Sequence, residues 1–130
     1  GSNLWDDVSS AEGAAGDVEY RCEYVKNTHG TLTLIGAKVW IQANTPSGDT
    51  AVDIALGTAA ISANEQSVAD ESTAPAGVSW SSAANEGAAL AIGDLAPGAT
   101  KAVWIRRTVN AGAAAFADSY TLRVKGDTLP

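Results

Sequence analysis

The stretch Lys101–Asn110, KAVWIRRTVN, indicates the fold of this chain more clearly than any other segment. Val103 and Ile105 would share one side of an extended chain and Trp104 the other, because successive side chains of a strand alternate in direction. A second stretch, AKVWIQAN at 37–44, has the same Val-Trp-Ile centre. We therefore expect two central strands that neighbour or face each other in one barrel or sandwich.

Alternating and turn-bounded segments continue along the rest of the chain. In residues 17–27, Val, Tyr, Cys and Tyr alternate with Glu, Arg and Glu, which is the pattern of a half-buried strand. A bulge is expected at Gly36, and a Pro-Gly turn at 95–98. Further short strands are predicted at 31–35, 51–56, 78–81, 88–92 and 120–125. The pattern predicts an all-β, immunoglobulin-like antiparallel β-sandwich of about seven strands.

Residues 58–87 have the least regular pattern, with mostly small and polar side chains. We expect a long connection between strands, in which a short helix over 63–70 is one alternative. The length of 130 residues fits a single domain. Residues 17–130 are assigned to the sandwich and 1–16 to an N-terminal arm that carries Leu4 and Trp5. Gly1 and Ser2 are interpreted as a cloning scar.

The charge distribution limits the partners that the chain would bind. The formal net charge of −7 argues against nonspecific binding to nucleic acid or anionic membranes, which depends on clustered Lys and Arg. Acidic residues gather in 1–24 and basic residues in 101–125. We expect the two ends to meet as terminal strands paired side by side, with contact between copies as the alternative.

Cys22 is the only cysteine, so the fold cannot contain an intramolecular disulfide. Its position in an alternating strand favours a buried, inert thiol. The chain has no apolar run long enough to span a bilayer and does not open with a signal peptide. These features fit synthesis in the cytoplasm without a membrane partner.

Candidate catalytic residues are few. His29 is the sole histidine and lies in the turn segment Asn27–Gly30, where a solvated side chain is expected. A hydrolase would have to use it, but no G-x-S-x-G motif accompanies it. The carboxylate pairs at 6–7 and 70–71 fall in expected loops, and the chain has no glycine-rich phosphate loop or Cys/His cluster. We therefore expect no enzyme activity, cofactor or metal.

The two tryptophan-bearing strands are the best candidates for a binding surface. If their Val and Ile residues face the core, both tryptophans point outward beside polar side chains. Such a surface could stack a sugar ring or anchor a protein, because Trp and Arg are common in interface hot spots. The alternative is that both tryptophans lie in the core. The candidate surface consists of Lys38, Trp40, Gln42, Trp104, Arg106 and Arg107.

Three segments carry a resemblance to a known group of proteins: GDVEYRCEYVKNTHGTLTL at 16–34, AKVWIQANTP at 37–46 and DLAPGATKAVWIRRTVNAGAAA at 94–115. They resemble small proteins encoded in the structural modules of tailed phages and prophages. The last segment also looks like the Pro-Gly turn and penultimate strand of immunoglobulin-like add-on domains. The resemblance implies a virion protein, for head decoration or associated with the tail, without catalytic residues.

Two functions follow as hypotheses. The first is a non-enzymatic virion structural protein that contacts other virion proteins or copies of itself, and that is made in the bacterial host cytoplasm. The second is a carbohydrate-binding or host-adhesion module, in which Trp40, Trp80 or Trp104 would stack on a glycan.

Overall fold

The computed structural model describes residues 17–46, 48–111 and 119–129, which form six strands and one short 3-10 helix. The predicted all-β antiparallel sandwich is confirmed, and the expected arm at 1–16 lies outside the described residues. None of the described residues forms a helix that could span a membrane. The elements are β1 (Asp17–Lys26), β2 (Leu34–Ala43), β3 (Thr50–Leu56), η1 (Glu86–Ala88), β4 (Leu90–Leu95), β5 (Thr100–Val109) and β6 (Thr121–Asp127).

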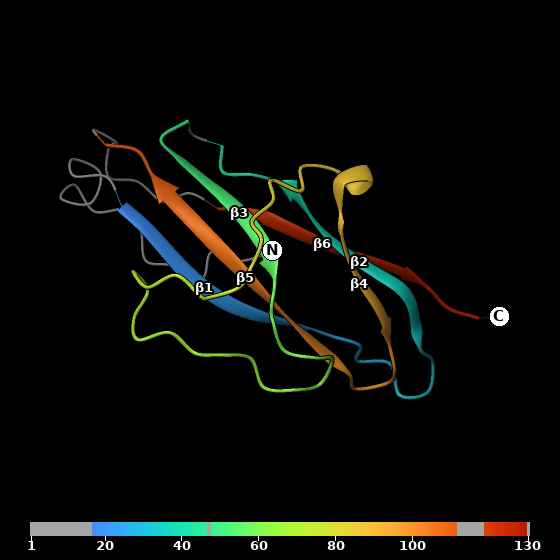
Figure 1. Cartoon of the computed structure of the whole chain (residues 1–130). Helices are drawn as coiled ribbons and strands as arrows, with labels where there is room; N and C mark the ends of the chain where they lie inside the picture. The colour runs from blue at the N-terminus through green and yellow to red at the C-terminus, as the bar shows by residue number, and fades with distance from the viewer. Residues whose placement is uncertain (1–16, 47, 112–118, 130) are drawn as a thin grey trace.

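The six described strands alternate strictly between two sheets along the chain. One sheet has the order β1-β5-β3 and the other the order β4-β2-β6, and all pairs are antiparallel. No two consecutive described strands pair, so each connection crosses from one sheet to the other (Figure 1). The constant-type immunoglobulin arrangement differs, because its strands A and B share a sheet, as do F and G.

The two Val-Trp-Ile stretches form the central strands of the two sheets, as the sequence predicts. β5 lies between β1 and β3, and β2 lies between β4 and β6. Val39, Ile41, Val103 and Ile105 are all buried and belong to the hydrophobic core between the sheets. Gly36 has φ +61°, and the register of β2 shifts around it, which confirms the bulge.

In a usual amphipathic strand the apolar side chains face the core, but β1 directs a charged side chain inward and an aromatic one outward. Glu19 is its one buried residue, whereas Tyr24 is exposed. Glu19 pairs across to Arg107, on the same side of β5 as the core residue Ile105. The acidic segment therefore meets the basic one within the domain. The expected pairing of terminal strands is wrong, because the partner of β1 is β5, and β6 lies in the other sheet.

The long connection between β3 and β4 runs along the β1-β5-β3 sheet and returns across it (Figure 1). The helix considered over 63–70 does not form, and the strand expected at 78–81 is reduced to a single bridge between Ser81 and Ile54. The connection starts at Gly57, where an added Cβ would come within 2.8 Å of the Ala102 Cβ. A larger residue at 57 would force the connection away from β5.

Candidate functional site

Trp104 lies on the outer face of the β1-β5-β3 sheet, opposite the core residues Val103 and Ile105. The predicted side is right, but the predicted accessibility is wrong, since Trp104 is only 2% exposed. Its indole Nε1 donates a hydrogen bond to Glu65 Oε2 at 2.9 Å. The connection between β3 and β4 therefore covers the outer face of the sheet and removes Trp104 from the candidate surface.

Glu65 is one of the residues that hold this connection against the sheet. Its carboxylate also accepts hydrogen bonds from the backbone N–H groups of Thr58 and Ala59 and from the Thr58 hydroxyl. Burial opposes the charged form, but the hydrogen bonds from Trp104, Thr58 and Ala59 together outweigh it and lower the pKa of Glu65 to about 2. The carboxylate is thus an ionised acceptor that links the connection to β5.

Acidification is expected to release this link. A carboxylate whose pKa is lowered by folding stabilises the fold fully at pH values above its ordinary pKa of 4.5. This contribution is lost as the pH falls through about 2, the pKa of Glu65 in the folded protein. In an NMR titration, the indole N–H of Trp104 should shift with a midpoint near pH 2. Glu65→Gln is the control, because its amide does not titrate. A midpoint near 4.5 would contradict the assignment.

A second aromatic contact covers the same face of the sheet. Trp80, from the connection, packs against Tyr20 with ring centroids 5.7 Å apart. The Arg106 guanidinium lies 4.8 Å from the centre of the Trp80 ring, and it also pairs with Asp53 at 2.6 Å. Trp80 therefore contributes to packing, and Arg106 keeps one side of its ring occupied.

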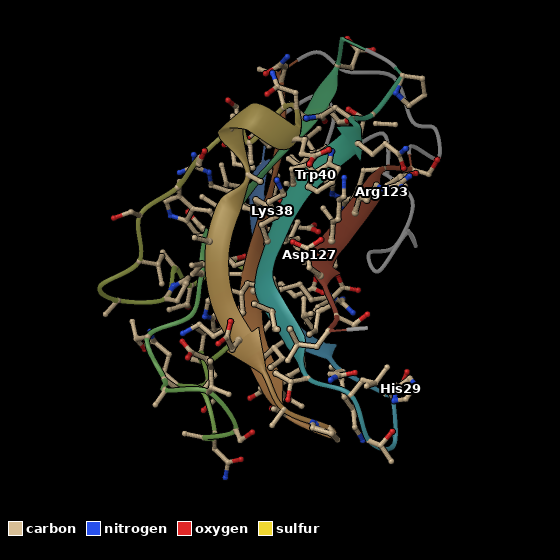
Figure 2. The ribbon with its side chains drawn as sticks, turned by 90° about the vertical axis from the view of Figure 1, so that its right-hand side faces the viewer. His29, Lys38, Trp40, Arg123 and Asp127 are labelled. Carbon is tan, nitrogen blue, oxygen red and sulfur yellow. The ribbon has the colours of Figure 1, made fainter. Side chains whose placement is uncertain are left out.

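Trp40 lies on the outer face of the other sheet, on the opposite side of β2 from Val39. Its cross-strand neighbour is Arg123 on β6, and Lys38 precedes it on the same side (Figure 2). Trp40 is nevertheless only 6% exposed, so its expected accessibility is also wrong. The accessible groups on this face are polar, including exposed Gln42.

The outer face of β2 and β6 is basic. Lys38 and Lys125 are opposite each other in the register, and both pair with Glu86 of η1, at 2.8 and 3.3 Å. Their interaction lowers the pKa of the Glu86 carboxyl. Arg123 has no ion-pair partner among the described residues. We call Lys38, Gln42, Arg123 and Lys125 the basic face.

Arg107 belongs to the interior and not to a surface. Its guanidinium binds Glu19 at 2.7 Å, and both side chains are buried. Arg107 is opposite Val52 in the register of β3 and β5, and Val52 is also a core residue. The expected surface role of Arg107 is therefore wrong, because two adjacent residues of a strand, Arg106 and Arg107, point to opposite faces.

A hollow of about 440 Å³ opens between β1 and the connection. Tyr20, Tyr24, Gln66 and Glu71 are among its lining residues, together with Cys22. Cys22 is half-buried, and burial, with the nearby carboxylates of Glu65 and Glu23, raises the pKa of its thiol to about 11. The thiol thus stays protonated at neutral pH, as expected of an inert cysteine, but Cys22 is half-buried where a buried side chain was expected.

His29 is exposed in the turn after β1, as expected (Figure 2). Its Nδ1 accepts hydrogen bonds from the backbone N–H groups of Thr31 and Leu32, at 3.1 and 2.9 Å. Asn27 ties the same turn to the body of the domain, because its side-chain amide donates to the carbonyl oxygens of Leu32 and Leu95. The His29 side chain thus has a structural role in the turn.

Within the described residues, no group of three or more His, Cys, Asp or Glu side chains is placed to hold a metal ion. Comparisons with protein-family models, curated proteins and solved structures found no match to this chain. Function therefore has to be argued from the surfaces themselves.

Proposed function

We propose that this chain is a non-enzymatic structural protein of a tailed-phage virion, in head decoration or in the tail, that acts through protein–protein contacts. The resemblance of three of its segments to proteins of phage structural modules supports this role. Its partners are other virion proteins or copies of itself. The basic face is the observation that carries the proposal.

The basic face differs in charge from the rest of the protein. It presents Lys38, Arg123 and Lys125 against two carboxylates, Glu86 and Asp127, on a chain whose formal net charge is −7. Arg123 and Lys125 are exposed, and the side chain of Lys125 is 53% accessible. Complementary charges select partners and orient them during association. The partner is accordingly an acidic protein surface.

The internal use of the tryptophans supports the same role. Trp40 and Trp104 are buried, and Trp80 packs on Tyr20 and Arg106. Trp40 and Trp104 therefore offer no accessible face on which a sugar ring could stack, and Trp80 is half-buried. Trp80 and Trp104 instead fix the connection to the sheet, and a rigid domain keeps its contact surface in one shape.

Charge reversal on the basic face tests the proposal. Arg123→Glu with Lys125→Glu should reduce attachment to purified capsids or tails at least tenfold, measured by co-sedimentation at low salt. The double variant Arg123→Lys with Lys125→Arg keeps the charge and should attach normally. Equal attachment by both variants would contradict the role of the basic face.

Glycan binding is the outcome that would favour the other hypothesis. The hollow beside β1 offers exposed Tyr24 and the polar side chains of Gln66 and Asp70. Binding to a glycan array that is lost in Tyr24→Ala, with the fold intact and without any attachment to virion parts, would replace the structural role.

A further inference from the structure

The backbone of β6 is open along one side. β6 is an outer strand of its sheet and pairs with β2 (Figure 2). The outer strands of the other sheet both have backbone contacts with the connection between β3 and β4, at Tyr20 of β1 and at Ile54 of β3. Among the described residues, β6 has no backbone partner besides β2. Its free edge therefore offers alternate N–H and C=O groups to a further strand.

A concavity of about 280 Å³ lies beside β6, where this strand and β1 of the other sheet come together. We call it the edge groove. Leu122 and Val124 of β6 line it, on the same side of the sheet as the core residues of β2. Its floor includes the fully buried Val39 and Val103. The groove therefore reaches the core on the side to which every second side chain of an added strand would point.

The lining of the edge groove is mostly apolar, and its charged residues belong to β1. Val124 is 38% exposed and Tyr24 is 50% exposed, which makes them two of the few accessible large hydrophobic residues of the described chain. Glu23 and Lys26 also line the groove, and their opposite charges cancel. The groove thus favours apolar side chains and gives no preference to either sign of charge.

The opposite side of β6 belongs to the basic face. Arg123 and Lys125 alternate with the groove residues Leu122 and Val124, so they point outward. Asp127 follows on the same side, at the end of the strand. The outward side chains of an added strand have the same two-residue spacing. Carboxylates at two such positions would therefore form cross-strand charge pairs with Arg123 and Lys125.

A second copy of β6 does not meet these conditions. Two copies of the strand in full antiparallel overlap would place Arg123 and Lys125 opposite each other at two positions. Like charges directly opposite each other destabilise a strand pair. The charges of β6 therefore favour an acidic segment of a different protein.

We propose that β6 receives an extended segment of a partner protein as an additional strand, in which acidic and apolar side chains alternate. The apolar side chains fill the edge groove, and the acidic ones pair with Arg123 and Lys125. Backbone hydrogen bonds to the free edge of β6 supply affinity, and the alternating side chains supply specificity. This inference rests on the proposed function, because it specifies how the acidic partner binds to the basic face.

A synthetic peptide tests the strand addition. Acetyl-Ser-Val-Glu-Val-Glu-Val-Ser-amide has the length of β6, and its two glutamates have the spacing of Arg123 and Lys125. At saturation it should slow hydrogen exchange at least tenfold at the backbone amides of β6 that do not bond to β2, which are every second amide. The matched peptide with lysine in place of both glutamates should bind at least tenfold more weakly.

Two peptides with N-methyl groups distinguish strand addition from ion pairing alone. One is methylated at the backbone nitrogens of the valines and the other at those of the glutamates. Only alternate amides of a strand donate to a given neighbour, so one of the two peptides should lose binding and the other should keep it.

A substitution in the edge groove tests the apolar contacts. Val124→Glu places a carboxylate in the groove and should weaken binding of the unmethylated peptide at least tenfold. Ala91→Glu is the matched control, at an exposed position of β4 on the other edge of the same sheet, and should bind normally. Circular dichroism checks that both variants are folded.

The possible outcomes separate this inference from the virion role. Equal binding of the two N-methylated peptides, or equal binding by Val124→Glu and Ala91→Glu, would overturn strand addition. Unchanged exchange in β6, with attachment to capsids or tails that still depends on Arg123 and Lys125, would overturn it and leave the virion role standing. Slowed exchange without such attachment would support strand addition and contradict the virion role.

Discussion

Arg107→Met is expected to lower the free energy of unfolding by about 3–5 kcal/mol, because it removes the charged partner of a carboxylate inside the sandwich. The Arg107 guanidinium and the Glu19 carboxylate are 2.7 Å apart, and both side chains are buried. Methionine fills a similar volume but cannot compensate the charge of Glu19. Urea unfolding followed by circular dichroism measures the difference.

The neighbouring arginine provides the matched control for this experiment. Arg106 points to the other face of β5, where it pairs with Asp53 and contacts Trp80 with about a third of its side chain exposed. Arg106→Met should therefore cost only about 1–2 kcal/mol, since solvent weakens its ion pair. The double variant Glu19→Leu with Arg107→Met should be more stable than Arg107→Met alone. If Arg107→Met and Arg106→Met lowered the free energy of unfolding equally, burial of the Arg107–Glu19 pair would not increase its effect on stability.

Trp104→Ala is expected to lower the free energy of unfolding by about 3–5 kcal/mol, the usual cost of deleting a buried tryptophan side chain. The ring is 2% exposed, and its N–H binds Glu65, so the substitution also releases the connection between β3 and β4. Trp104→Phe keeps most of the packing and loses the donor, which should cost about 1–2 kcal/mol. Denaturant unfolding measures both, and hydrogen exchange at Thr58 and Ala59 should accelerate in both variants.

Gln42→Ala is the control for the tryptophan substitutions. Gln42 is exposed at the end of the other central strand, and its removal should change stability by less than about 0.5 kcal/mol. If Trp104→Ala proved no more harmful than Gln42→Ala, Trp104 would not be the contact that holds the connection.

Strand patterns predict the all-β sandwich and its two central strands, but not the order of the strands in the sheets. The Val-Trp-Ile centres at 39–41 and 103–105 predict two central strands whose Val and Ile residues face the core, and the structure has this arrangement. Gly36 was recognised as a bulge from an isolated glycine inside a strand pattern. Both inferences rest on local features, which a sequence displays directly.

The position of the connection between β3 and β4 over the outer face of the β1-β5-β3 sheet could not be predicted in this way. Residues 58–87 have no periodic pattern, and Glu65 is one polar residue among many, so nothing in the sequence connects it to Trp104. The residues of the expected surface lie on the outer sides of their strands except Arg107, and the connection buries Trp104. Lys38, Gln42 and, in part, Arg106 remain accessible.

The sequence does contain a signal for the inward orientation of Glu19. Arg106 and Arg107 are adjacent in a central strand, so one of them has to point into the sandwich. A buried arginine requires an acidic partner, and the alternating carboxylates at 19 and 23 supply one on the neighbouring strand. The tyrosines of β1 then face outward, where Tyr20 packs under Trp80.

Because the strands alternate between the two sheets, strand pairs can form only late during synthesis on the ribosome. β1 is the first described strand to be synthesised, yet its partner β5 begins only at Thr100. At a synthesis rate of about 5–20 residues per second, the ribosome needs roughly 4–15 s after the end of β1 to reach the first residue of β5. Because no described strand pairs with the next one, the nascent chain cannot shelter its apolar segments in hairpins as they emerge. Folding therefore has to start from distant contacts, which makes it slow and keeps apolar segments of the unfinished chain exposed for longer.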